Sequence, residues 1–388
     1  MKKMDYTLNL IVAILAIISV VFIYSSSTAS GQYTANFAIK QAIFYVLGAI
    51  LMFVISKFDF EQLKKISWYI YFIVFASILL LIIAPESIAR PVNGAKAWYQ
   101  IKYIGTIQPS EFLKVAFVIL LSKIVVDHQR KVKEKNLKTD MYLLVKIALI
   151  TLPPMLVVYE QPDTGMIMLY MSIIIPIIYF SGISNKILFV ISSIPIIVLS
   201  TLIIMYFKFY SSFEKYVIGS LSPHQQPRIT GWLHPFENGD ASLQTRNSLL
   251  AIGSGELEGN GFLKNEVYIP EKHTDFIFAT IGEEFGFIGS SFTIILFFLL
   301  IYRIIYITQK ANDNFAYLMC SGIVGLLLFQ VFQNIGMTIG LLPVTGVTLP
   351  FLSNGGSSLL SNMMLIGFVH SIKKSYSGYM FTKKNLSL

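Results

Sequence analysis

Long apolar runs constrain what this chain can fold into more than any other feature of its sequence. Residues 8–24 and 187–207 are two such runs, each close to the ~20 residues that an α-helix needs to cross a bilayer. Strands of membrane barrels are shorter and alternate apolar with polar residues, so these runs predict helices. Only 13% of the 388 residues are charged, against about 25% in an average soluble domain. We therefore predict an all-α, polytopic membrane protein.

The apolar runs predict about ten transmembrane helices. The basic N-terminus resembles a signal peptide, but its apolar run is long for one, so we interpret it as a retained first helix. One long polar stretch, residues 208–275, lies between the seventh and eighth helices and is predicted to be an extracellular loop within a single membrane domain, residues 1–388. The expected helices lie near residues 7–26, 38–56, 66–84, 110–126, 143–159, 164–181, 186–207, 284–306, 316–341 and 356–372.

The Lys and Arg residues indicate how these helices are oriented. They gather in alternate connections, such as residues 57–65 and 127–140, and in the tail 373–384, whereas the short connections 28–37 and 160–163 carry none. By the positive-inside rule, both termini are expected in the cytoplasm. This topology also explains the net charge of +9, so no nucleic-acid partner is expected.

One outer segment departs from the charge pattern. Residues 86–109 contain Arg90, Lys96 and Lys102, although topology places them outside. These cations indicate either an anionic ligand or an exception to a statistical rule.

No metal site is predicted. His224, His234 and His273 share the outer loop, but their spacing is not that of a metal motif. Cys320 is the single cysteine of the chain, which excludes an intramolecular disulfide and argues against thiolate ligation.

Asp275 occupies the junction between the polar loop and the eighth apolar run. Burial at the membrane edge favours a neutral carboxyl group and raises its pKa, which suits a general base working near neutral pH. A structural interpretation is also open, because Asp is a common helix N-cap.

Ionisable residues inside membrane helices are costly and therefore candidates for function. Glu111 and Lys114 have i, i+3 spacing, which predicts an ion pair on one face of the fourth helix, with either a structural or a functional role. Asp163, at the outer start of the sixth helix, is interpreted as a cap.

Two irregular segments carry further information. The glycines of residues 252–262 do not have the spacing of a nucleotide loop, so we interpret them as sites of turns and close backbone approach. Residues 334–358 are apolar but interrupted by Pro and Gly. Non-helical backbone at membrane depth is tolerated against protein or a cavity, so this segment is expected to line a pocket.

Several short motifs lie in a fixed order along most of the chain: Asn93-Gly94-Ala95, Trp98, Gln108-Pro109-Ser110-Glu111 with Lys114, Gln161-Pro162-Asp163, Ile252-Gly253-Ser254-Gly255, Pro270-Glu271, His273-Thr274-Asp275-Phe276, Glu283-Glu284, Asn334-Ile335-Gly336 and Gly355-Gly356-Ser357-Ser358. With these motifs in this order, the chain resembles the shape, elongation, division and sporulation family of RodA, FtsW and SpoVE. The form His-Thr-Asp-Phe favours the RodA branch.

The resemblance implies a peptidoglycan glycosyltransferase that polymerises lipid II on the outer face of the cytoplasmic membrane, together with a class B penicillin-binding protein. It places the essential aspartate on Asp275 and the ion pair of the fourth helix on Glu111 and Lys114. The chain departs from the family at several positions that bear on substrate binding, which are Ala97, Asn247, Glu256 and Asn354.

Glycan extension needs a base for the attacking sugar hydroxyl and positive charge near the departing diphosphate. No second carboxylate is evidently placed to form a covalent intermediate, so inversion at the anomeric carbon is expected. A divalent cation such as Mg²⁺ or Mn²⁺ could supply part of the positive charge, and the sequence leaves this cofactor open. Lys272 is one of the outer cations, and the residues expected to bind substrate are Lys114, Glu111, Lys96, Arg246, His273 and Ser357.

Two other function classes remain open at this stage. A lipid II flippase would need polar groups along the depth of the membrane, whereas the ionisable residues here gather near the outer face. A scaffold for the penicillin-binding protein would give no reason for the concentration of motifs in the outer loops. Both features favour the enzyme.

Overall fold

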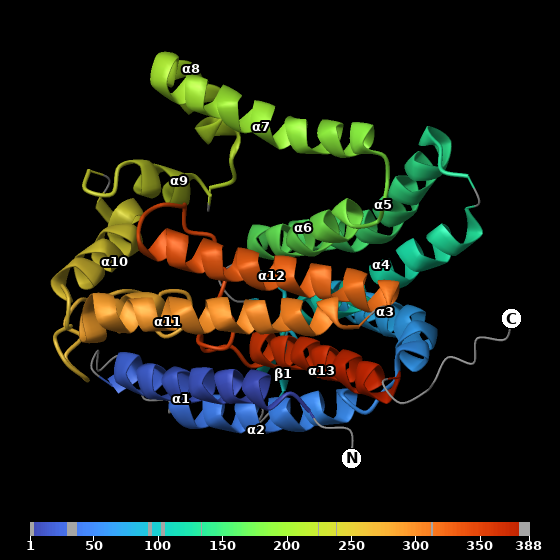
Figure 1. The fold of residues 1–388 in the computed structure, drawn as a ribbon. Coiled ribbons are helices and arrows are strands. Elements are labelled where there is room, and N and C mark those ends of the chain that lie inside the picture. The colour runs from blue at the N-terminus through green and yellow to red at the C-terminus, as the bar shows by residue number, and fades with distance from the viewer. Residues whose placement is uncertain are drawn as a thin grey trace, which may run out of the picture.

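A computed structural model describes residues 4–28, 37–91, 95–101, 105–132, 134–223, 225–237, 239–311 and 313–379. The predictions for Asn93, Gly94, Lys102 and His224 lie outside these residues. Within them, ten helices of at least 16 residues match the ten predicted spans, which confirms the all-α membrane fold (Figure 1). They are α1 (Tyr6–Thr28), α2 (Phe37–Ile55), α3 (Phe60–Ile83), α4 (Pro109–Lys131), α5 (Leu137–Glu160), α6 (Thr164–Tyr179), α7 (Asn185–Lys208), α11 (Ile277–Gln309), α12 (Asn314–Thr338) and α13 (Gly356–Tyr379).

Helix α4 lies at the centre of the bundle. It packs against α3, α5, α6, α12 and α13, so its side chains are buried on nearly every side. Tyr170 of α6 holds the N-terminal end of α4 by donating a hydrogen bond to the Ser110 carbonyl, 2.8 Å away. In contrast, α7 stands apart from the bundle in Figure 1, and Ile187 is its one buried residue. An apolar helix with so little protein around it exposes its side chains to lipid.

The outer loop predicted for residues 208–275 contains several short helices. These are α8 (Tyr210–Tyr216), η1 (Ile218–Ser220), α9 (Gln226–Leu233), η2 (Gly239–Ser242) and α10 (Leu243–Ser254). Helix α10 packs along α11, which seats this part of the chain on the bundle. Before α4, the strands β1 (Tyr99–Ile101) and β2 (Gly105–Ile107) form an antiparallel pair in which Tyr99 faces Ile107.

Helix α11 is broken at Gly286, which adopts φ +57° and ψ −150°. In a continuous helix the amides of Phe287 and Ile288 would donate to the carbonyls of Glu283 and Glu284. At the break, the segment 256–261 satisfies all four groups. The Phe287 and Ile288 amides donate to the carbonyls of residues 256 and 257, and the Glu283 and Glu284 carbonyls accept from the amides of residues 260 and 261, at 2.9–3.2 Å. The break therefore leaves no backbone group among these unsatisfied.

The glycines of the outer loop permit this contact, as the sequence predicted. A Cβ atom on Gly255 would lie 1.9 Å from the Gly282 carbonyl oxygen, and one on Gly259 would lie 2.1 Å from that of Glu284. At Gly286, whose φ is positive, a Cβ would lie 2.6 Å from the Gly255 carbonyl oxygen. Only glycine allows the two backbones to approach so closely.

We predict that Gly286→Ala destabilises the protein by about 2 kcal/mol or more, because this backbone conformation is strained for alanine and the added methyl group meets backbone atoms. The measurement is the midpoint of thermal unfolding in detergent. Gly253→Ala is the matched control, since a Cβ there meets nothing within 4 Å. Equal midpoints for the two variants would contradict the role given to the break.

Candidate active site

A cavity of about 550 Å³ opens between α2, α4, α6 and two irregular segments. Carboxylates of Glu111, Asp163, Glu271 and Asp275 border it, together with the ammonium group of Lys40. The segment 346–358 forms one wall, which confirms that this Pro- and Gly-interrupted stretch lines a pocket. Sequence segments more than 200 residues apart thus place their polar groups around one space.

Asp275 lies at the wall of this cavity, directly before α11. The N-cap of α11 is Phe276, and within the described residues no hydrogen bond reaches the Asp275 carboxylate, so the cap interpretation is wrong. The Asp275 backbone is held instead, because Asn334 donates to its carbonyl oxygen at 2.7 Å and to that of Val347 at 2.8 Å. These two hydrogen bonds join the residue before the start of α11 to the segment that forms the cavity wall.

Burial raises the pKa of Asp275 to about 6. The carboxylates of Glu271 and Asp163 contribute to this rise in pKa, and the positive charge of Arg228 opposes it. A carboxyl group with this pKa is ionised near neutral pH but binds a proton more readily than an ordinary aspartate, so it can act as a base.

Arg228 of α9 was not among the predicted site residues. Its guanidinium approaches the cavity wall, with Nη1 4.0 Å from the position of a Cβ on Gly346, and its charge acts on both Asp275 and Asp163. Lys40, in the first turn of α2, borders the same cavity and was also missed. The signal was present for Arg228, because it is a cation in an outer segment, as is Arg246.

Asp163 caps α6, as predicted. Its Oδ1 accepts a hydrogen bond from the Met166 amide at 3.0 Å, and its Oδ2 accepts one from the Gln108 side chain at 2.9 Å. Burial raises the pKa of Asp163. The cap therefore also places a carboxyl group at the cavity, opposite the segment that carries Asp275.

The Glu111–Lys114 pair is present, with 2.5 Å between Oε2 and Nζ. Glu111 borders the cavity and also accepts a hydrogen bond from Ser361 of α13. Lys114 is fully buried behind it and does not border the cavity. The lysine charge thus acts on the site through Glu111.

The remaining predicted residues lie at different distances from the cavity. Ser357 borders the cavity, and its hydroxyl oxygen accepts a hydrogen bond from the backbone amide of Gln108 at 2.9 Å. His273 is buried and stacks on Phe37, with 4.4 Å between ring centroids, and burial lowers its pKa.

Lys96 donates to carbonyls at the end of α3, and Arg246 is half-buried in α10, so neither borders the cavity. Among the described residues, no group of three or more His, Cys, Asp or Glu side chains could hold a metal ion.

The sequence model described as a cell cycle protein of the FtsW, RodA and SpoVE type matches residues 6–378. The chain belongs to the FtsW/RodA/SpoVE family. It is 33% identical to stage V sporulation protein E of Bacillus subtilis, over 97% of this chain and 98% of that protein. It is 30% identical to the peptidoglycan glycosyltransferase RodA of Treponema pallidum, over 95% and 97%. Relatives from these branches have similar identities, so the preference for the RodA branch stays a prediction.

Solved structures of this family type share the fold. A chain from a structure on the coordination of polymerisation and crosslinking by a peptidoglycan synthase complex superposes with a TM-score of 0.75, at 24% identity, covering 96% of this chain and 98% of that one. The rod shape determining protein RodA of Thermus thermophilus gives a TM-score of 0.65 at 23% identity, covering 95% and 96%. These matches support a multi-pass membrane protein.

We predict that Glu111→Gln destabilises this family member by about 3–5 kcal/mol, because it leaves the Lys114 ammonium buried without its counter-charge. Glu111→Gln/Lys114→Met should restore most of the loss, as measured by thermal unfolding in detergent. The control is Glu61→Gln, which breaks a pair of the same spacing whose glutamate is 72% exposed, and it should cost less than about 1 kcal/mol. A similar loss in Glu111→Gln and Glu61→Gln would contradict this prediction.

Proposed function

We propose that this protein is a peptidoglycan glycosyltransferase that polymerises lipid II, with Asp275 as general base. The observation that carries the proposal is the position of Asp275, whose carboxyl group borders a cavity and has a pKa raised to about 6. Membership of a family whose members include named peptidoglycan glycosyltransferases supports the choice of reaction.

In the proposed reaction, Asp275 takes the proton of an acceptor sugar hydroxyl as that oxygen attacks the anomeric carbon of the donor. The bond to the lipid diphosphate breaks on the opposite face, which inverts the anomeric configuration. The diphosphate leaves already ionised, so it needs positive charge rather than a proton. Lys40, which borders the cavity, and Arg228, whose charge acts on Asp275, are the cations that would supply that charge.

The orientation that we propose places the cavity on the outer side and both termini in the cytoplasm. In Figure 1, α1 begins and α13 ends towards the side of the bundle that holds the basic α4–α5 and α11–α12 connections, whereas α9 and α10 lie at the other end. Under this orientation residues 208–275 are extracellular within a single membrane domain. We further propose a class B penicillin-binding protein as partner, which the fold shared with the synthase-complex chain supports.

The central test is Asp275→Asn in purified protein with lipid II and the partner. The variant should make glycan polymer at least about 10² times more slowly than the parent, because an amide cannot accept the hydroxyl proton. Gel analysis of the polymer measures the rate, and co-purification of the partner checks that the fold is intact. Polymer formation at the parent rate would remove the base assignment, and lipid II flipping without polymer would favour a transporter. The same assay with chelator tests for a divalent cation.

The pH dependence of polymerisation should follow the Asp275 carboxyl group. The base works when ionised, so kcat/KM should fall as pH drops below about 6 and should lose about tenfold per further pH unit. An ordinary aspartate would begin this fall near a pH of ~4. Returning each sample to neutral pH before a second assay separates titration from unfolding.

Arg228→Gln should lower kcat by about 10–10³-fold, because the departing diphosphate loses a cation. It should also move the acid limb of the pH profile to higher pH, since the Arg228 charge lowers the pKa of Asp275. The same glycan assay measures both effects. Lys215→Gln, in the outer helix α8, is the matched control and should leave both unchanged. If Arg228→Gln behaves like this control, the cation near the diphosphate must be another residue.

A further inference from the structure

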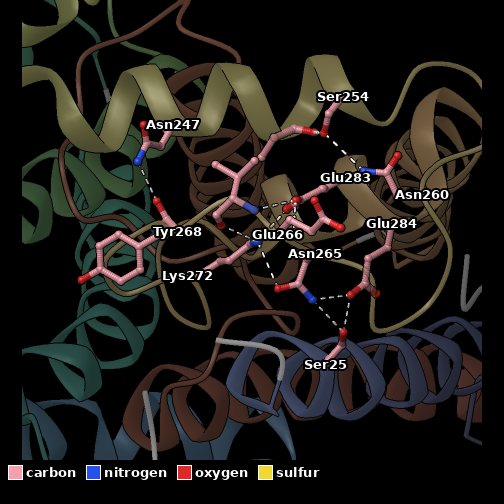
Figure 2. Close-up of polar contacts among 12 residues, drawn as sticks. Ser25, Asn247, Ser254, Asn260, Asn265, Glu266, Tyr268, Lys272, Glu283 and Glu284 are labelled. Carbon is pink, nitrogen blue, oxygen red and sulfur yellow. Dashed lines mark hydrogen bonds and ion pairs between the residues drawn. The ribbon is translucent and has the colours of Figure 1, made fainter. Parts of the chain in front are cut away.

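A buried ion pair involves a residue near Asp275 in the sequence, and neither of its members borders the cavity. Lys272 precedes Asp275 by three residues, and its Nζ lies 2.6 Å from Oε2 of Glu283 in α11. The Glu283 side chain is fully buried and that of Lys272 is 4% exposed. Figure 2 shows the two side chains meeting beneath α10, surrounded by the segment that leads to the site. Lys272 was expected among the outer cations, but in this position it cannot contact a ligand in the cavity.

The glutamate gathers donors from three points of this segment. Its Oε1 accepts hydrogen bonds from the backbone amides of Glu266, at 2.7 Å, and Val267, at 2.9 Å, while Oε2 receives Lys272. Residues 266–272 are thereby fixed to the second turn of α11, which is the helix that follows Asp275. Asp275 lies in the short stretch between the two halves of this attachment.

Lys272 also binds residues of the segment to which it belongs. In addition to Glu283, its Nζ donates to the Val267 carbonyl at 3.1 Å and to Oδ1 of Asn265 at 3.2 Å. Asn265 in turn donates to Ser25 of α1 at 3.0 Å and to Glu284, so the attachment extends to a second helix (Figure 2). The ammonium group therefore joins three parts of the chain at one point.

Stability alone gives little reason for such a pair. The cost of removing both charges from water offsets most of their attraction, and apolar residues of similar volume are often as stable or more so. Burial does lower the pKa of Lys272, as expected for a costly charge. What the pair provides, and apolar side chains do not, is a directed set of hydrogen bonds that fixes a backbone segment.

We propose that Lys272 and Glu283 are positioning residues that hold the segment 265–275 so that the Asp275 carboxyl group faces the cavity. The pair contacts neither substrate nor reacting atoms. This inference rests on the proposed function, since it assumes that Asp275 is the base. Loss of the lysine frees the chain three residues from Asp275, and a displacement of about 1 Å at a reacting group can cost about 10²-fold in rate.

The test uses Lys272→Met/Glu283→Gln in full-length protein with its partner and lipid II. This variant leaves no unpaired buried charge, and the glutamine keeps an oxygen for the two amides, so it is expected to fold. Its kcat should fall about 10–100-fold while KM for lipid II stays within about twofold. The acid limb of its pH profile should move to lower pH, because a loosened Asp275 gains water. A purely structural role would reduce the amount of active protein without moving that limb.

The matched control is Lys264→Met/Glu266→Gln, which removes one lysine and one glutamate from exposed positions at the start of this segment and directly before it. It should retain the parent kcat and pH profile. A Lys272→Met/Glu283→Gln variant with the kcat and acid limb of the control would overturn the positioning role. The Asp275→Asn variant, run beside them, separates the two proposals, since its activity at the parent rate would instead remove the base on which this inference rests.

Discussion

Inside a bilayer no water is available to backbone polar groups, so each of them needs a hydrogen-bond partner in the protein. The break in α11 is possible because this requirement is met. Gly286 interrupts the helical hydrogen bonds, and the segment 256–261 replaces them one for one. This exchange anchors the loop to α11 on both sides of the break. The Glu283 carboxylate anchors the same loop again, at residues 266 and 267. The location of Asp275 follows from both attachments, because it lies between the anchored loop and the start of the helix.

Several ionisable groups in and near the site form two sets. Glu111–Lys114 and Lys272–Glu283 neutralise each other in contact, with the lysines buried. Asp275 and Lys40 instead border the cavity, and the charge of Arg228 acts on Asp275. The Lys272–Glu283 pair binds backbone groups of the segment that leads to Asp275, whereas the charges at the cavity are available to a ligand.

The sequence predicted the helices well because hydrophobic length is a local property. It also identified Asp275, Asp163 and the i, i+3 pair, since each depends on neighbours within one turn or on a recognisable motif. It missed the contributions of Arg228 and Lys40, and it counted Lys96, Arg246 and Lys272 by charge alone. Whether an outer cation reaches the cavity depends on how α9 and α10 fold over the bundle, and this packing joins residues far apart in the chain. The glycine at position 286 is visible in the sequence, but the hydrogen-bond partners that make the break possible lie in residues 256–261, which the sequence alone does not place there.

The cavity electrostatics explain why one carboxyl group, rather than its neighbours, suits proton transfer. Asp163 uses both oxygens in hydrogen bonds, one to the α6 amide and one to Gln108, which leaves it less free to accept a proton. Glu111 is engaged by Lys114 and Ser361. Asp275 is held through its backbone instead, so its position is fixed while its carboxylate keeps its capacity to bind a proton. A base needs this combination, because an oxygen committed to other donors would have to give them up before it could accept the hydroxyl proton.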